Sequence, residues 1–289
     1  MKVNTKFKDS VFTMLFSEPD MLRELYCAIR GVSLPPDVPV SINTLENVLF
    51  MDFNNDISFE IGGKLVVLIE HQSTVNPNMA LRLLVYVTRV LEKKIQGRAL
   101  YSKKRLGIPR PEFYVLYNGQ EPYPDEKVLL LSDLFEKPEG LGLPENAPAM
   151  ELEVRVLNIN EGRNRGVAGR CRKLAEYSAF IAKVRSLWKE TGNLEPAIQE
   201  AIKYCEKHDI LKEFLEIHGS EILNMILTEW NTEDAIAFAR EEGREEGREE
   251  GWEKGRDESI QYVLKLLDQG FAAEEIRRRL KNGGAECNS

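Results

Sequence analysis

The chain has 289 residues, of which 43% are hydrophobic and 30% charged, a composition typical of a globular protein that fills one large or two smaller domains. The net charge of −8 argues against nucleic-acid binding by the whole surface, although a local basic patch is compatible with it. The longest apolar runs, such as Leu65 to Ile69, are far shorter than the roughly 20 residues that cross a bilayer, so we expect no membrane partner.

The first quarter of the chain predicts two helices, a loop and a group of strands. Residues 7–16 carry apolar side chains at helical spacing, and a second helix is expected to end at Gly31. The proline-rich stretch 34–40 predicts a loop. Residues 47–72 predict strands, because short apolar runs follow one another there and a double glycine at 62–63 separates the last two.

The segment NPNMALRLLVYVTRVLEKKIQ predicts a long helix with two different faces. Asn76 is suited to the N-cap and Pro77 to the first helical position. We expect one face to be buried and another to form a cationic stripe. The residues predicted to be buried are Leu81, Leu84, Val85, Leu91 and Ile95. The predicted stripe consists of Arg82, Tyr86, Arg89 and Lys93.

The rest of the chain predicts two further strands and then mainly helices. The strands are EFYVLYNG and ELEVRVLNIN, and residues 165–230 are mostly helical in pattern. This order predicts an α/β layer with a mixed sheet. We divide the chain into an α/β core (1–150), a mostly helical extension (151–238) and a charged tail (239–289). The EEGR repeat of the tail lacks a continuous apolar stripe, which indicates a solvated helix or linker ahead of a terminal helix pair.

Cysteine usage and the N-terminus indicate a reducing compartment. The four cysteines lie far apart with no CxxC spacing, which argues against a zinc site and against a disulfide framework. The N-terminal residues have no apolar core of the signal-peptide type. We therefore expect a cytoplasmic location.

The predicted hairpin around the double glycine contains two carboxylates whose relative position depends on the strand register. With a two-residue turn, Asp56 and Glu70 would point to opposite faces. With a three-residue turn that includes Lys64, one face becomes wholly apolar; it consists of Ile57, Phe59, Ile61, Leu65, Val67 and Ile69. Since a buried face selects strongly against a slip of one residue, we predict the longer turn, with Lys64 in the left-handed position that glycine usually takes.

In that register Asp56 and Glu70 are direct cross-strand partners, with Cβ atoms about 4.5–5.5 Å apart. Like charges in this position are destabilising unless a cation offsets them, and Mg²⁺ takes one or two carboxylates together with water and phosphate oxygens. Gln72 points to the same face as Glu70, whereas His71 points away and offers only its carbonyl. The arrangement suits hydrolysis of a phosphodiester, in which the cation polarises the phosphoryl oxygen and generates hydroxide from water.

Basic residues concentrate near the end of the long helix. Seven basic side chains and no acid lie between residues 93 and 110, and five more basic side chains lie between 163 and 173. We expect the helix stripe and the first of these runs to bind the DNA backbone. The predicted DNA-binding residues are Arg82, Tyr86, Arg89, Lys93, Lys94, Arg98, Lys103, Lys104 and Arg105.

Each of these features also has a purely structural interpretation. A hairpin can carry an Asp and a Glu on a solvent-facing side, and the His71 ring can pack in the core. Asp9 can be a plain N-cap of the first helix. The stripe that starts at Arg82 can be an ordinary solvated helix face, and the basic run can serve only to keep a loop soluble.

The strings ND-I-SF, LIEHQST and NPNMALRLLVY resemble the recombination-promoting nuclease (Rpn) and transposase family of the PD-(D/E)XK nuclease superfamily. The resemblance extends to KDSVFTMLF, VLYNGQEPYP, LSDLF, VLNINEGRN and the EEGREEG repeat, over roughly residues 5 to 245. It implies an α/β fold with a PD-(D/E)XK-type αβββαβ core and a mixed sheet, followed by a mostly helical region and a charged helical tail. It also implies Mg²⁺-dependent endonuclease activity on DNA, with Mn²⁺ as an alternative metal, and a role in recombination.

Residue by residue, the resemblance implies that Asp56 and Glu70 are the metal carboxylates and that the carbonyl of His71 is a third ligand. Gln72 stands where the superfamily more often has lysine, and Asp9 corresponds to an acidic residue of the first helix. Three functions stay open. The leading one is a metal-dependent DNA endonuclease linked to recombination or transposition; the others are a catalytically weak or inactive DNA-binding relative, and an interaction protein that acts through its charged tail. Homo-oligomer formation is also left open.

Overall fold

The computed structural model describes residues 11–43, 56–95, 100–136, 148–228 and 266. By its internal contacts the chain divides into two units, Met1–Glu229 and Trp230–Ser289, and the fold described here is that of the first unit. The predicted tail from residue 239 lies outside the described residues apart from Leu266.

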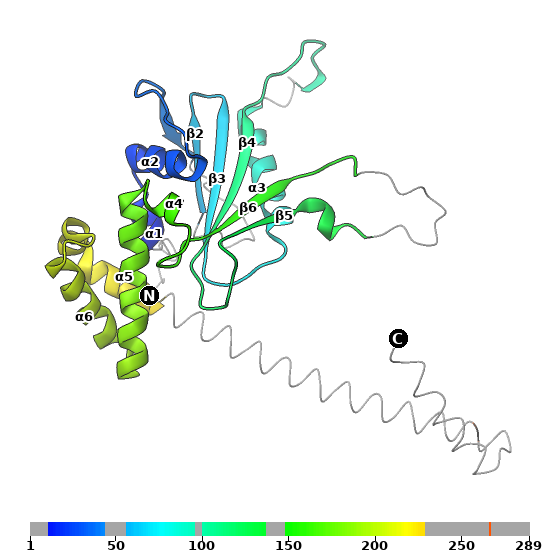
Figure 1. Ribbon diagram of the computed structural model, residues 1–289. Helices are drawn as coiled ribbons and strands as arrows, with labels where there is room; N and C mark the ends of the chain where they lie inside the picture. Colours follow the sequence, from blue (N-terminus) through cyan, green and yellow to red (C-terminus); the bar gives the residue numbers. More distant parts are fainter. Residues whose placement is uncertain (1–10, 44–55, 96–99, 137–147, 229–265, 267–289) are drawn as a thin grey trace, which may run out of the picture. The chain divides into compact units, whose positions relative to one another are not determined.

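Helices and strands are both present in the first unit, which confirms the predicted α/β class (Figure 1). The helices are α1 (Val11–Leu15), α2 (Pro19–Arg30), α3 (Met79–Lys94), α4 (Arg165–Ala168), α5 (Arg172–Thr191) and α6 (Leu194–Lys207). The strands are β1 (Val40–Ile42), β2 (Asp56–Ile61), β3 (Leu65–Gln72), β4 (Arg110–Tyr117), β5 (Glu126–Leu130) and β6 (Glu153–Asn158), and the 3₁₀ helix η2 covers Leu131–Leu134. Residues 212–228 are also helical.

The strands form one mixed six-stranded sheet in the order β1-β2-β3-β4-β6-β5. The first three strands pair antiparallel, whereas β4 is parallel to β3 and β6 is parallel to β4. Edge strand β5 returns antiparallel to β6. The change from antiparallel to parallel pairing occurs where α3 connects β3 to β4, because parallel neighbours require a long crossover connection.

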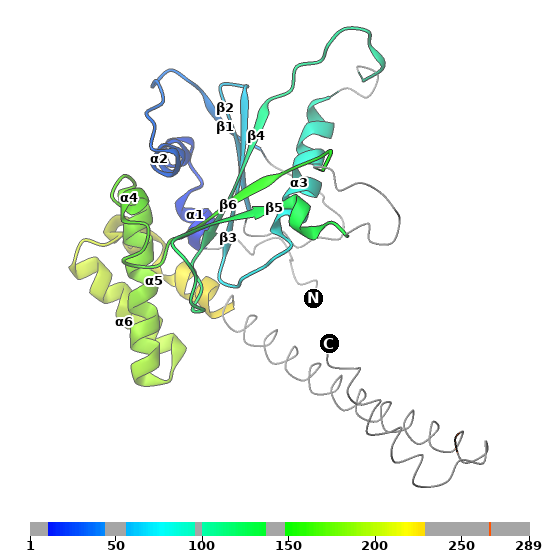
Figure 2. The ribbon, with the colours of Figure 1, turned by 45° about the vertical axis from the view of Figure 1, so that its right-hand side comes forward.

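Helices cover both faces of this sheet. Figures 1 and 2 show α3 on one side and α1, α2 and α5 on the other. Strand β3 lies in the middle and is therefore buried on both faces, which explains its nearly continuous apolar sequence LVVLIEHQ. Its residues alternate between the two layers: Val66 and Leu68 pack with α3, and the ring of His71 stacks on Phe12 of α1.

Helix α3 differs from the prediction in its start and in its buried face. It begins at Met79, and Asn76 accepts a hydrogen bond from the Asn78 backbone N–H (2.9 Å) instead of capping the helix. The residues that α3 buries are Met79, Ala80, Leu83, Tyr86, Val87 and Val90. Leu81, expected in the core, is 48% exposed. The prediction was wrong because Leu81 shares its side of the helix with the exposed Thr88 and Glu92, whereas the apolar stripe follows Met79, Leu83, Tyr86 and Val90.

Two strands were not predicted from the sequence. Strand β1 lies at the end of the proline-rich stretch that we expected to be a loop, and Val40 pairs there with Ile61. Strand β5 is mostly exposed and has no regular apolar alternation. Both lie at the edges of the sheet, where a strand needs little apolar character.

The sheet and its helices extend past the boundary that we predicted at residue 150. Strand β6 follows that boundary and pairs with both β4 and β5. Helix α5 contacts the sheet through Ser178, whose hydroxyl donates to the carbonyl of Ile159 (2.5 Å). The residues up to 229 are accordingly one unit. Among the described residues, Cys27, Cys171 and Cys205 are free thiols, and none of the described helices has the length and apolar character of a membrane span.

Candidate metal and nucleic-acid site

The register of the β2–β3 hairpin is the one predicted from its apolar face. Asp56 pairs with Glu70 and Ile61 pairs with Leu65, which leaves a three-residue turn. The left-handed positions of this turn are Gly62 (φ 59°) and Gly63 (φ 65°). We expected Lys64 in a left-handed conformation, and this detail was wrong. Two consecutive glycines accept positive φ without steric cost, so lysine is spared that conformation.

The carboxylate of Glu70 is buried, with 2% of the residue exposed, and two groups hold it. The side-chain amide of Gln72 donates to Glu70 Oε2 at 2.8 Å. Arg82 Nη2 lies 3.3 Å from the same oxygen. A buried carboxylate requires such partners, because transfer of an isolated charge from water is strongly unfavourable.

Met79, in the first turn of α3, contacts both of these partners. Met79 Sδ is 2.9 Å from the Gln72 amide nitrogen and 3.6 Å from Arg82 Nη1. Gln72 and Arg82 therefore meet Glu70 over the end of β3, on the face that α3 covers. This contact between a strand and a helix was not expected from the sequence, which assigned Arg82 to a surface stripe.

The ring of His71 lies on the opposite face, as predicted. It is buried, stacks on Phe12 with ring centroids 4.7 Å apart, and has Nε2 3.1 Å from the hydroxyl of Tyr177. Burial lowers the pKa of His71 to about 3, and the positive charge of Arg185 adds to this effect. The imidazole is therefore neutral at physiological pH, and its ring belongs to the packing of α1 and α5 against the sheet.

Of the other two predicted acidic residues, Asp56 is described only by its backbone and Asp9 is not described. The backbone of Asp56 pairs with Glu70, but its side chain and all of Asp9 lie outside the described residues. Within the described part of the chain, no group of three or more His, Cys, Asp or Glu residues is arranged to hold a metal ion. The carboxylate oxygens of Glu70 have the donor chemistry that Mg²⁺ prefers. Arg82 now neutralises this carboxylate, so a metal ion would compete with it.

The predicted cationic stripe of α3 does not form a single exposed face. Tyr86 is 7% exposed and packs in the core, so the residue is not part of an exposed stripe. Arg82 is engaged with Glu70, and Lys94 forms an ion pair with the buried carboxylate of Glu60. Arg89 is half-buried, and Lys93 is exposed.

The basic residues beyond α3 are more accessible. Lys103, Lys104 and Arg105 are all exposed, whereas Arg98 lies outside the described residues. The second basic cluster, between 163 and 173, is used largely within the fold. Arg170 donates two hydrogen bonds to the carbonyl of Ala28 (3.0 and 2.8 Å), and Arg172 pairs with Glu176.

Polar residues at the ends of the parallel strands form a network that we did not identify from the sequence. Arg185 of α5 donates to the side-chain oxygens of Asn118 (2.9 Å) and Asn160 (3.0 Å). Asn118 follows β4 and Asn160 follows β6. The strings YNG and NIN, in which asparagines follow an apolar run, are the signal that could have revealed it, because the carboxyl ends of parallel strands meet at one edge of a sheet.

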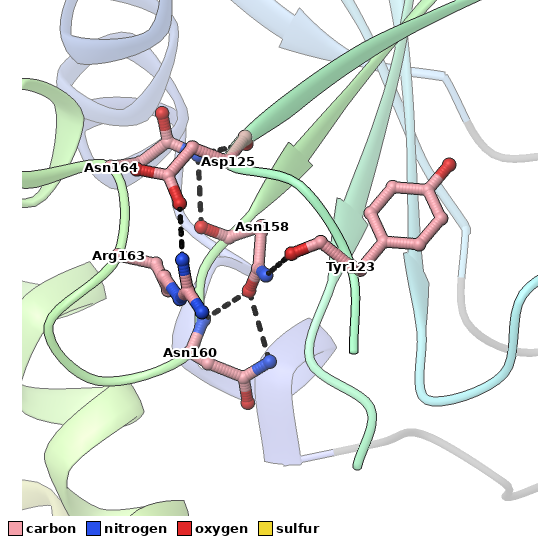
Figure 3. A network of polar contacts seen from close by, with 6 residues as sticks. All are labelled: Tyr123, Asp125, Asn158, Asn160, Arg163 and Asn164. Atoms are coloured by element: carbon pink, nitrogen blue, oxygen red, sulfur yellow. Dashed lines mark hydrogen bonds and ion pairs between the residues drawn. The ribbon is translucent and has the colours of Figure 1, made fainter. Parts of the chain in front are cut away.

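Figure 3 shows the adjoining contacts around Asn158, the last residue of β6. Its amide donates to the carbonyl of Tyr123 (2.9 Å), and its side-chain oxygen accepts from the Asn160 backbone N–H (3.1 Å). Asn164 donates to the carbonyl of Asn158 (2.9 Å), and Arg163 pairs with Asp125 (3.0 Å). These bonds connect the loop after β4 to the loop after β6, which is a structural role.

Comparison with known families bears directly on the hairpin and α3. Residues 48–154 match the family model described as "Putative transposase, YhgA-like". This segment is similar to the YhgA-like putative transposase family. The match confirms the noted resemblance for residues 48–154, and it spans β2, β3 and α3, which contain Glu70, Gln72 and Arg82. The comparisons with curated proteins and with solved structures found no match.

Proposed function

We propose that the protein is a Mg²⁺-dependent endonuclease that hydrolyses DNA in recombination or transposition, with Mn²⁺ as an alternative metal. The pairing of Asp56 with Glu70 across β2 and β3 is the observation that carries this proposal. Two acidic residues in directly opposed strand positions need a compensating positive charge, which Arg82 supplies to Glu70 without metal and which a bound metal would supply to both. The segment similar to the YhgA-like family contains both residues.

The order of elements supports the same proposal. A helix (α2), three antiparallel strands (β1–β3), a crossover helix (α3) and a parallel strand (β4) follow one another in the chain. This is the αβββαβ order that the resemblance implies for a PD-(D/E)XK-type core. Fold alone does not establish activity, so the assignment depends on the side chains at the end of β3.

In the proposed site, Asp56, Glu70 and the carbonyl of His71 would hold the cation. A bound divalent cation would polarise the phosphoryl oxygen of the scissile bond. Gln72, which now donates to Glu70, would orient the attacking water by hydrogen bonding. Glutamine carries no charge, so a different residue has to supply the cation that lysine provides in other members of the superfamily.

We assign that role to Arg82. Its guanidinium is 3.3 Å from the carboxylate that would hold the metal, and it would be free to leave Glu70 once that carboxylate served as a metal ligand. Because α3 keeps it next to the site, the freed guanidinium can bind a phosphate through two parallel hydrogen bonds. Arg82 would thus pair with Glu70 without metal and with the substrate once metal is bound.

The same contact also favours the second candidate, a DNA-binding relative without turnover. If the Arg82–Glu70 pair is permanent, the carboxylate is not available to a metal. DNA binding would then be indifferent to Mg²⁺ and would weaken steeply with salt, by a slope of about −0.9 for each phosphate neutralised on duplex DNA.

Cleavage of supercoiled plasmid distinguishes the two candidates. The variants are Asp56→Asn and Glu70→Gln, with Glu126→Gln on edge strand β5 as the control. The endonuclease proposal expects nicking by the wild type and the control only when Mg²⁺ or Mn²⁺ is present. It also expects none by the two site variants, although their DNA binding is retained. Cleavage that persists in both site variants would discard the assignment of these carboxylates.

A further inference from the structure

The segment 100–109 between α3 and β4, which we call the arm, exposes an unusual set of side chains. Figures 1 and 2 show it extending beyond the start of β4. Its large apolar residues are accessible to solvent, with exposed fractions of 65% for Leu100, 91% for Tyr101, 42% for Leu106 and 54% for Ile108. Single exposed apolar residues are ordinary on protein surfaces, but several gathered on one short segment mark an interaction site.

Basic residues separate the apolar ones along the arm. Lys103, Lys104 and Arg105 lie between Tyr101 and Leu106, and all three are exposed. Among the residues that the structure describes, none of the three forms an ion pair, and the sequence from 93 to 110 contains no acid. The ligand of the arm must therefore combine negative charge with flat or apolar groups.

Nucleic acid with accessible bases has both properties. Proteins that bind single strands combine cations along the backbone with aromatic rings on which bases stack, and every base has a ring face that can stack. In a paired duplex that face is covered by the neighbouring base pairs. The ring of Tyr101 would meet such a face only where the strand is unpaired.

We propose that the arm recognises DNA with unpaired bases, with Tyr101 stacked on a base and Lys103, Lys104 and Arg105 on the flanking phosphates. The choice of DNA as the ligand rests on the proposed function, which this inference extends by naming the class of substrate: single strands, bubbles and junctions in preference to continuous duplex.

The arm is separate from the proposed catalytic residues. It follows the C-terminal end of α3, whereas Arg82 meets Glu70 near the N-terminal end of the same helix. At 1.5 Å per residue, the sixteen residues of α3 put about 24 Å between these two ends. Substitutions in the arm can therefore change DNA binding without altering the metal site.

Fluorescence anisotropy of the full chain in EDTA tests the proposal with three labelled probes: a single strand, the matching duplex, and the same duplex with a central bubble. The variants are Tyr101→Ala, Tyr101→Phe and the double change Lys103→Gln with Lys104→Gln. Ile217→Ala is the matched control, because Ile217 is 75% exposed and lies outside the arm.

Wild type is expected to prefer the single strand and the bubble over the duplex by about tenfold, the size of one base-stacking contact. Tyr101→Ala should remove this preference and leave the salt dependence unchanged, while Tyr101→Phe and Ile217→Ala keep both. The double lysine variant should reduce the salt slope on the single strand by about 1.4, since each phosphate contact contributes about 0.7.

Equal affinity of wild type and Tyr101→Ala for all three probes would overturn the proposal. So would an equal loss on all three probes. It would also be overturned if Tyr101→Ala lost binding to vesicles of phosphatidylcholine and phosphatidylserine while its DNA binding stayed unchanged. Because the measurement needs no metal, its outcome is independent of catalysis. If the protein shows the stacking preference but never cleaves DNA, only the endonuclease proposal is contradicted. If it cleaves DNA without that preference, only the proposal for the arm is contradicted.

Discussion

Among single residues, Arg82 has two opposite expected effects on the proposed chemistry, because it holds the carboxylate that the metal would use. We predict that Arg82→Met strengthens the binding of Mg²⁺ or Mn²⁺ and weakens cleavage. Removal of the competing guanidinium makes Glu70 more available, and removal of the cation leaves the phosphate without its partner. Without metal, the variant should lose about 2 kcal/mol of stability, as expected when a buried carboxylate loses one of its partners.

Isothermal titration calorimetry and plasmid cleavage measure the two effects separately. Arg89→Met is the control for metal affinity, because Arg89 lies on the same helix and is half-buried. Metal affinity and cleavage that fall together in Arg82→Met would show that Arg82 only supports the fold of the site.

The sequence predicted the strand partner of Glu70 but not the contact between Glu70 and Arg82. The pairing of Glu70 with Asp56 follows from the period-two alternation of β2 and β3, which is a local property of the chain. The contact with Arg82 depends on how α3 is rotated about its axis. That rotation is set by packing against the whole sheet, and the prediction assigned Leu81 and Val85 to the buried face in place of Leu83 and Val87.

The turn after β4 leaves no room for a side chain at Gly119. A Cβ atom on Gly119 would lie 2.0 Å from the carbonyl oxygen of Ser73, so the loops that follow β3 and β4 are in direct contact there. We predict that Gly119→Ala destabilises the protein by about 3 kcal/mol, the upper end of the cost of overpacking.

Urea unfolding checks this prediction against Gly107→Ala. A Cβ atom on Gly107 would meet no atom within 4 Å, so that variant should change the free energy of unfolding by less than about 0.5 kcal/mol. Equal stability of the two variants would show that the loops after β3 and β4 can separate without cost.

Elements with strong periodicity were predictable, and those defined by their neighbours were not. Strands β3, β4 and β6 have long apolar runs and were expected. Helix α2 was expected to end at Gly31, which is in the left-handed conformation (φ 66°). Strands β1 and β5 depend on pairing with β2 and β6, and short exposed segments carry little of that information in their own sequence.

For the molecule as a whole, the structure places the boundary of the folded core near residue 229 and not near 150. A chain that ends at Glu229 is predicted to unfold cooperatively and to keep its response to metal. A chain that ends at residue 150 lacks β6 and α5, and therefore lacks the partners of β4, β5 and His71. We expect it to show no cooperative transition.

Thermal melting followed by far-UV circular dichroism tests both truncations. A cooperative transition in the shorter chain would mean that residues up to 150 fold without β6. The division at 150 followed a change in sequence pattern, from strands to helices. Composition along the chain cannot show that a strand beyond such a change inserts between two earlier strands, β4 and β5, because this pairing is a long-range contact.

The central claim is that Glu70 takes part in binding a divalent cation, and a melting-temperature titration tests it without knowledge of the substrate. Mg²⁺ should stabilise the wild type progressively, by about 2.7 kcal/mol at one hundred times the dissociation constant. Glu70→Gln, which keeps the shape of the side chain and removes its charge, should show no increase over its own metal-free melting temperature. An equal increase in both proteins, or no increase in the wild type, would contradict the claim.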